Sequence, residues 1–96
     1  MVSVAIDAFS PTGDIRFLTG GNYFQGGASP VRLTISSTGG VGLGTEAPKT
    51  KLHISSGDLY LDDATKGIIM KSPNGQCWKV IVGDTGTLSS TLITCP

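Results

Sequence analysis

Residues 32–55 read RLTISSTGGVGLGTEAPKTKLHIS, and this stretch decides the fold. Its two ends, Arg32–Ile35 and Lys51–Ile54, alternate polar and apolar residues, which is the pattern of a half-buried β-strand. The glycines and the single proline between these ends predict a tight turn, because glycine tolerates backbone conformations that other residues avoid. The stretch therefore predicts two short strands joined by a glycine-rich turn.

The same period of two residues runs through the rest of the chain, and helical spacing is interrupted everywhere by glycine or proline. Further strands are predicted at Ile15–Leu18, Leu59–Leu61, Gly67–Ser72, Cys77–Val82 and Leu88–Cys95. The pair Asn74-Gly75 is a hairpin signal, because both positions tolerate positive φ. A second turn, at 83–86, completes a predicted three-stranded antiparallel meander over 67–95. We therefore expect an all-β fold.

Two segments of the chain echo each other. Arg32–Ser37 and Lys51–Ser56 share the order basic, Leu, polar, Ile, Ser, Ser. A strand and turn that recur at a fixed offset are typical of repetitive β architectures, in which a unit covers its apolar face with a neighbour. That neighbour is either the next unit or another chain.

The composition leaves little margin for a stable monomer. A single domain of 96 residues buries roughly 60 to 65% of its extended surface. Fourteen glycines raise the entropy lost on folding, and only six aromatic residues supply large apolar areas. Association with partner chains would supply the missing burial.

The charge pattern excludes several partners. Seven Lys plus Arg residues balance seven Asp plus Glu residues, and no basic run supplies the footprint of a nucleic-acid binder. No apolar run reaches the roughly 18 to 20 residues that span a bilayer, and the amino terminus lacks the pattern of a signal peptide. We expect no nucleic-acid partner and no membrane insertion.

The two cysteines test the predicted meander. A hairpin turn centred on Gly86 would place Cys77 opposite Cys95, at a separation that a disulfide can bridge. Two reduced, buried thiols are the alternative.

No motif for catalysis or metal binding is complete. The glycine-rich run 39–45 is not followed by the Lys-Ser/Thr pair or the helix that a phosphate loop needs. His53 is the only histidine, and we expect it on the surface; three copies around a three-fold axis are the one arrangement that would make it a metal ligand. Asp58, Asp62 and Asp63 lack the glycine and glutamate of a calcium loop, and 62–67 is better explained as a solvated turn held by Asx hydrogen bonds. We predict no enzyme activity, no metal and no cofactor.

One loop has the composition of a recognition surface. Asn22 and Tyr23 lie between glycine pairs, and with Tyr60 they are the candidate ligand-binding residues. Aromatic and amide side chains of this kind are suited to sugars. A monomeric carbohydrate-binding β module is therefore an alternative reading of the chain.

The segment GVGLGTEAPKTKLHI, residues 40–54, resembles the element GNVGIGTxxPxxKLxV found near the distal ends of phage tail fibres and related trimeric fibre proteins. Leu43 stands where isoleucine is commoner, and Arg32–Ile35 resembles the strand that precedes the element. Residues 57–75 and the ending Cys95-Pro96 look like the carboxy-terminal ends of phage-type fibre proteins.

The resemblance implies an intertwined homotrimer, built as a triple-stranded β-helix or β-prism and ending in the small antiparallel meander. It implies a structural component of a virion, outside the cell, that serves attachment to a host glycan or protein. Many relatives continue into a self-cleaving chaperone of the peptidase S74 type, which is absent before Pro96. Either that domain was removed, or the meander itself sets the alignment of the three chains in the trimer. We favour the second explanation. A bacterial surface adhesin would share the architecture.

The resemblance also divides the chain and assigns its faces. It implies a β-rich fibre segment at 1–31, the repetitive element at 32–66 and the meander tip at 67–96. Arg32, Thr34, Lys51 and His53 are expected to face water. The residues expected to face the trimer axis are Leu33, Ile35, Leu52, Ile54, Leu59 and Leu61.

Overall fold

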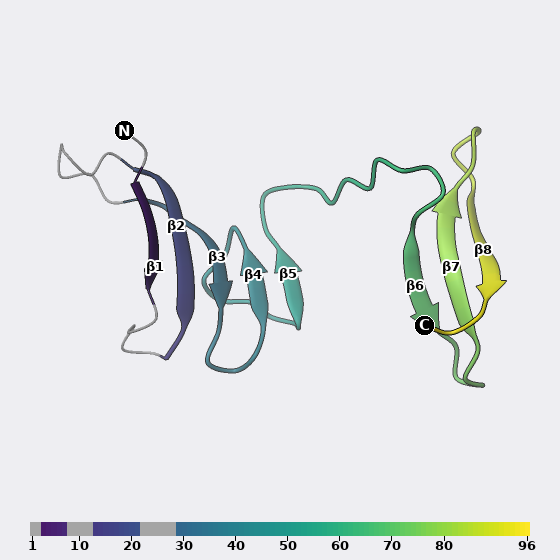
Figure 1. The fold of residues 1–96 in the computed structure, drawn as a ribbon, viewed down its shortest axis with the longest axis horizontal. Helices are drawn as coiled ribbons and strands as arrows, with labels where there is room; N and C mark the ends of the chain where they lie inside the picture. The colour runs from purple at the N-terminus through teal and green to yellow at the C-terminus, as the bar shows by residue number, and fades with distance from the viewer. Residues whose placement is uncertain (1–2, 8–12, 22–28) are drawn as a thin grey trace. The chain divides into compact units, whose positions relative to one another are not determined.

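The computed structural model describes residues 3–7, 13–21 and 29–96. These residues form eight β-strands in two sheets and no helix, so the predicted all-β class is confirmed (Figure 1). Contacts divide the chain into two compact units, Met1–Leu59 and Tyr60–Pro96, and each unit holds one sheet. Residues 60–66, expected to belong to the repetitive element, thus lie in the unit of the meander.

The first unit contains a five-stranded sheet in chain order. Its strands are β1 (Ser3–Asp7), β2 (Ile15–Gly21), β3 (Val31–Ile35), β4 (Val41–Leu43) and β5 (Leu52–Ile54). The first four are antiparallel neighbours, whereas β4 and β5 run parallel. The glycine-rich stretch expected to be a single turn is therefore a strand, β4, with a glycine turn at each end.

The turn between β3 and β4 closes a short hairpin. Ser36 and Gly40 form the last backbone pair, with the amide of Ser36 donating to the carbonyl of Gly40 at 2.8 Å. The amide of Gly39 donates back to the carbonyl of Ser36, and Gly39 has φ of 94°. A three-residue loop that ends in a left-handed residue fits the twist of a hairpin, and glycine adopts that conformation without a steric penalty.

The connection from β4 to β5, residues 44–51, is called the crossover loop. Parallel strands usually need a crossover of a dozen or more residues, but this loop is short because it lies directly on β4. A β carbon at Gly40 would come within 2.8 Å of the carbonyl oxygen of Thr50 and 3.1 Å of the ring of Pro48. A β carbon at Gly42 would collide with the carbonyl oxygen of Thr45. The alternate glycines of GVG therefore provide the surface on which the loop rests.

The sequence echo has an unexpected geometry. The segment at 32–37 includes most of β3 and the segment at 51–56 includes all of β5, and both strands flank β4. Since β3 is antiparallel to β4 while β5 is parallel to it, the two similar segments run in opposite directions. The two similar segments of this chain are therefore not successive units of a repeat that runs in one direction.

The second unit is a three-stranded antiparallel sheet, as the sequence predicted. Its strands are β6 (Ile68–Lys71), β7 (Cys77–Val82) and β8 (Leu88–Ile93), with β7 in the centre. The predicted strand at 59–61 does not form, because these residues pair with no strand in the described structure.

Both turns of the meander repeat the loop of the first hairpin. The amide of Gly75 donates to the carbonyl of Ser72, and the amide of Gly86 donates to the carbonyl of Gly83, at 2.9 Å each. Gly75 and Gly86 have φ of 87° and 83°. The hairpin that Asn74-Gly75 predicted is confirmed; its loop has three residues, and only the last of them, Gly75, has positive φ.

The register of the second hairpin also differs from the prediction. Val82 pairs with Leu88 and Cys77 pairs with Ile93, which centres the turn on Thr85 instead of Gly86. A disulfide nevertheless joins Cys77 to Cys95, with Cα atoms 5.2 Å apart. Cys95 lies past the end of β8, where the chain is free to bend toward Cys77.

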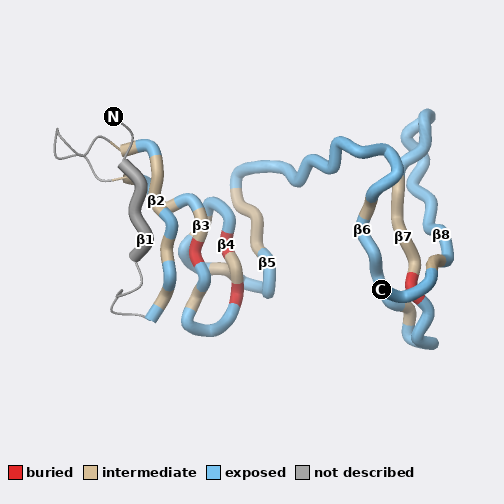
Figure 2. The backbone as a smooth tube through the Cα atoms, viewed as in Figure 1, coloured by how far each residue is buried: buried red, intermediate tan, exposed pale blue. Residues whose placement is uncertain are grey.

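Few of the residues whose burial is described are enclosed in either unit (Figure 2). Among the residues whose side chains are described, Thr34 and Cys77 are the buried non-glycine residues. The large apolar side chains instead remain partly or largely exposed to solvent.

Candidate functional site

The two faces of the five-stranded sheet differ sharply in chemistry. Cross-strand partners point to the same side of a sheet, so the register assigns each residue of β2 to β5 to a face. One face holds Ile15, Phe17, Leu33, Ile35, Val41, Leu43, Leu52 and Ile54. We call these eight residues the apolar sheet face.

The apolar sheet face is open in the single chain. Ile15, Phe17, Ile35 and Leu43 are exposed over more than a third of their surface, and Leu52 is 56% exposed. Leu33, Val41 and Ile54 are partly buried. Such a continuous apolar surface, with no charged member, is characteristic of a protein interface.

The opposite face is polar, and the crossover loop covers part of it. Arg16, Thr34, Gly42 and His53 share this face by register. Thr34 is completely buried, so the expectation that it faces water is wrong. The reason is that Gly42, its neighbour on β4, has no side chain and lets the crossover loop settle onto the sheet.

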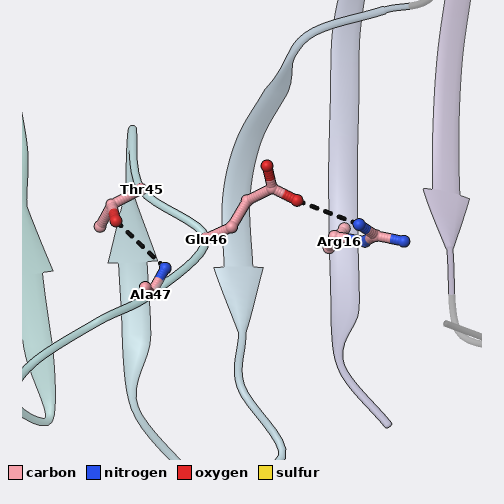
Figure 3. Close-up of polar contacts among 4 residues, drawn as sticks. All are labelled: Arg16, Thr45, Glu46 and Ala47. Carbon is pink, nitrogen blue, oxygen red and sulfur yellow. Dashed lines mark hydrogen bonds and ion pairs between the residues drawn. The ribbon is translucent and has the colours of Figure 1, made fainter. Parts of the chain in front are cut away.

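An ion pair fastens the crossover loop to β2 (Figure 3). The Arg16 guanidinium Nη1 lies 3.0 Å from Glu46 Oε1. Arg16 on β2 and Gly42 on β4 lie on either side of Thr34 by register. The Arg16–Glu46 ion pair therefore crosses β3 on the side where this threonine is buried. Within the loop, the amide of Ala47 donates to Thr45 Oγ1 at 3.1 Å.

The residues expected at the trimer axis fall into two groups. Leu33, Ile35, Leu52 and Ile54 all lie on the apolar sheet face. Leu59 and Leu61 lie outside the strands and are 59% and 48% exposed. The sequence reasoning missed the other four members, Ile15, Phe17, Val41 and Leu43. Alternating apolar residues in β2 and β4 were visible in the sequence. Only the register between the strands shows that these residues lie on the same face as those of β3 and β5.

The structure describes one of the three candidate sugar-binding residues. Asn22 and Tyr23 lie outside the described residues. Tyr60 is 84% exposed and lies at the start of the second unit.

Asp63, one of the three clustered aspartates, holds a turn of the backbone. Asp63 Oδ1 accepts hydrogen bonds from the Thr65 hydroxyl at 2.7 Å and from the Thr65 amide at 2.9 Å, which confirms the predicted Asx turn. The hydroxyl donor, followed by the amide, lowers the pKa of Asp63 below its ordinary 3.8. No group of three or more His, Cys, Asp or Glu side chains in the described part of the chain is arranged to hold a metal ion.

The single histidine is half-buried on the polar face. His53 Nδ1 accepts a hydrogen bond from the amide of Lys49 at 3.2 Å, which ties the crossover loop to β5. This side is opposite to the apolar sheet face. An assembly that buries the apolar sheet face at an axis would therefore keep His53 away from that axis.

Comparison with known proteins gives no match to this chain among protein-family models, curated proteins or solved structures. Among the described residues, no helix has the length and apolar character needed to cross a membrane.

Proposed function

We propose that this chain is a structural segment of a homotrimeric β fibre of phage type, in the distal part that serves attachment to a host cell. The apolar sheet face is the observation that carries the proposal. It presents eight apolar side chains in an unbroken surface that the single chain does not cover.

Association would supply the interior that the monomer lacks. Burying apolar surface stabilises by about 25 cal/mol per Å², and few of the side chains that the structure describes are enclosed within the chain. Packing the apolar sheet face against identical faces would create a common core without introducing a charge into it. Few unpaired strand edges would remain if the chains also wound around each other.

The polar side of the sheet has the properties of an outer surface. It carries the crossover loop with the exposed residues Lys49 and Lys51, together with the Arg16–Glu46 pair. Charges of both signs on that side would keep an assembled fibre soluble.

The resemblance of residues 40–54 to the fibre element supports both the number of chains and the viral setting. It also supports the attachment role, with a host glycan or surface protein as the partner. Within this segment, Gly40 and Gly42 leave room for the crossover loop, which contains Pro48.

The oligomeric mass tests the proposal. Sedimentation or light scattering at micromolar concentration is expected to give about three times the mass of the 9.9 kDa chain. The variant Leu52→Asp places a charge on the apolar sheet face and is expected to reduce the mass. The matched variant Lys51→Asp changes the adjacent residue, which alternates to the other side, and is expected to keep the trimer.

A monomeric wild-type chain would contradict the proposal and favour the carbohydrate-binding module. A glycan array on wild type and Tyr23→Ala would then be the decisive measurement. A sugar signal that depends on Tyr23 in a monomer would establish the module.

A further inference from the structure

The meander also has one apolar face. By register, β6, β7 and β8 place on one side Ile68, Met70, Trp78, Val80, Val82, Leu88, Ser90 and Leu92. We call these eight residues the meander face. Seven of them are apolar, the eighth is a serine, and none is charged.

The meander face is strongly exposed. The exposed fractions of its most open side chains range from 50% for Ile68 to 72% for Leu88. Five of the eight members are at least half exposed, and together they form a contiguous apolar patch of the kind that often serves as an interaction site. Within residues 60–96, Cys77 is the one buried side chain, so this unit has no apolar interior of its own.

The other side of the same sheet is mixed in character. By register it holds Lys71 and Lys79 together with Ile69, Ile81 and Ile93. The segment 63–66 also reaches that side, where Lys79 Nζ donates to the carbonyl oxygen of Thr65 at 3.1 Å. Ala64 and Thr65 line a hollow there with side chains of β7 and β8. This side is therefore covered in part by the chain itself and carries charges suited to water.

We propose that the meander face packs against the same face of other copies of this chain and forms a second association surface. The inference rests on the proposed function, because a trimer joined through the first unit holds the meanders at high effective concentration. A specific interface buries about 1,000 Å² or more in total, so the contact would cover most of the meander face on each copy. An uncharged face is complementary to itself, whereas a charged partner would leave its charges unpaired against it.

Trp78 reports directly on this contact. It is the only tryptophan of the chain and lies on the meander face. Its indole Nε1 donates to Ser72 Oγ at 3.1 Å, which fixes the ring on the sheet. A copy packed on the meander face would shield the indole from water and from a soluble quencher.

Two neighbouring serines of β8 provide a matched pair of variants. Ser90 belongs to the meander face, Ser89 points to the opposite side, and both are exposed. The experiment measures quenching of Trp78 emission by acrylamide in the full-length chain, together with the oligomeric mass. We expect Trp78 to be shielded in wild type and in Ser89→Asp, and to be quenched severalfold more strongly in Ser90→Asp. The variant Ser90→Ala completes the apolar surface and is expected to shield Trp78 at least as well as wild type, which tests the contact even if Ser90→Asp does not fold.

The outcomes separate this inference from the proposed function. A trimer in which Trp78 is equally accessible in wild type and Ser90→Asp overturns the second surface and leaves the fibre proposal intact. A dimer whose Trp78 shielding depends on Ser90 supports the surface and contradicts the trimer. A monomer contradicts both.

Discussion

The carbonyl oxygen of Thr45 occupies the space beside Gly42 that a β carbon at that position would fill. This close approach lets the crossover loop lie flat on β4 and lets β5 pair parallel to β4 after a short connection. A backbone atom cannot move aside as a flexible side chain can, so the position requires glycine.

The first prediction follows from that contact. Gly42→Ala is expected to destabilise the fold by about 2 to 3 kcal/mol, because overpacking against a fixed backbone has costs of this size. The control is Gly57→Ala, since a β carbon there meets nothing within 4 Å. Denaturant unfolding at one fixed protein concentration measures both variants. Equal midpoints for the two would refute the proposed role of Gly42.

The disulfide is the second test. Replacing both Cys77 and Cys95 with alanine is expected to reduce stability by about 3 kcal/mol, because the bond closes a loop of roughly twenty residues in the unfolded chain. Thermal melting with and without a reductant measures the effect. Wild type should melt at a lower temperature under reduction, whereas the double variant should not respond. A wild-type melting temperature that ignores complete reduction would contradict this account.

The third prediction concerns pH and Asp63. Because its pKa is lowered in the folded chain, its contribution to stability is present above the ordinary 3.8 and is lost as the pH falls through the lower folded value. The Thr65 hydroxyl is the first cause, so Thr65→Val should move the pKa of Asp63 back toward 3.8. An NMR titration of the Asp63 carboxyl carbon measures the shift. The same titration curve in wild type and variant would show that the hydroxyl has no such role.

The Arg16–Glu46 pair gives a fourth prediction with a small expected effect. The two side chains are 26% and 57% exposed, so solvent screens their attraction. Glu46→Gln should lower stability by only about 0.5 kcal/mol, and the difference should shrink at high salt. Unfolding midpoints at low and high ionic strength provide the measurement. A loss of several kcal/mol would mean that Glu46 has a larger role in the loop than this pair explains.

Much of the fold could be predicted from local patterns. Alternation in Cys77–Val82 located that strand at its observed bounds, and the glycine turns on either side identified the meander. These features are local, because a strand and its turns depend on neighbouring residues.

Other features depend on long-range contacts that alternation does not encode. Thr34 looks solvent-facing in its strand, but a loop from further along the chain covers its side of the sheet. The segment 59–61 has the residues of a strand but finds no partner to pair with. The apolar sheet face could be recognised only in part, because its membership depends on the register between strands that are distant in the sequence.

The enclosed hydroxyl of Thr34 has a consequence for engineering. Its Oγ1 is shut away from water and makes no hydrogen bond. Thr34→Val keeps the shape of the side chain, removes an unsatisfied polar atom and should raise stability by about 1 kcal/mol. Calorimetry of the variant would detect this gain as a higher melting temperature, and a lower one would mean that the hydroxyl is satisfied after all. If the gain is found, the exchange Thr34→Val would provide a more heat-resistant form of this sheet.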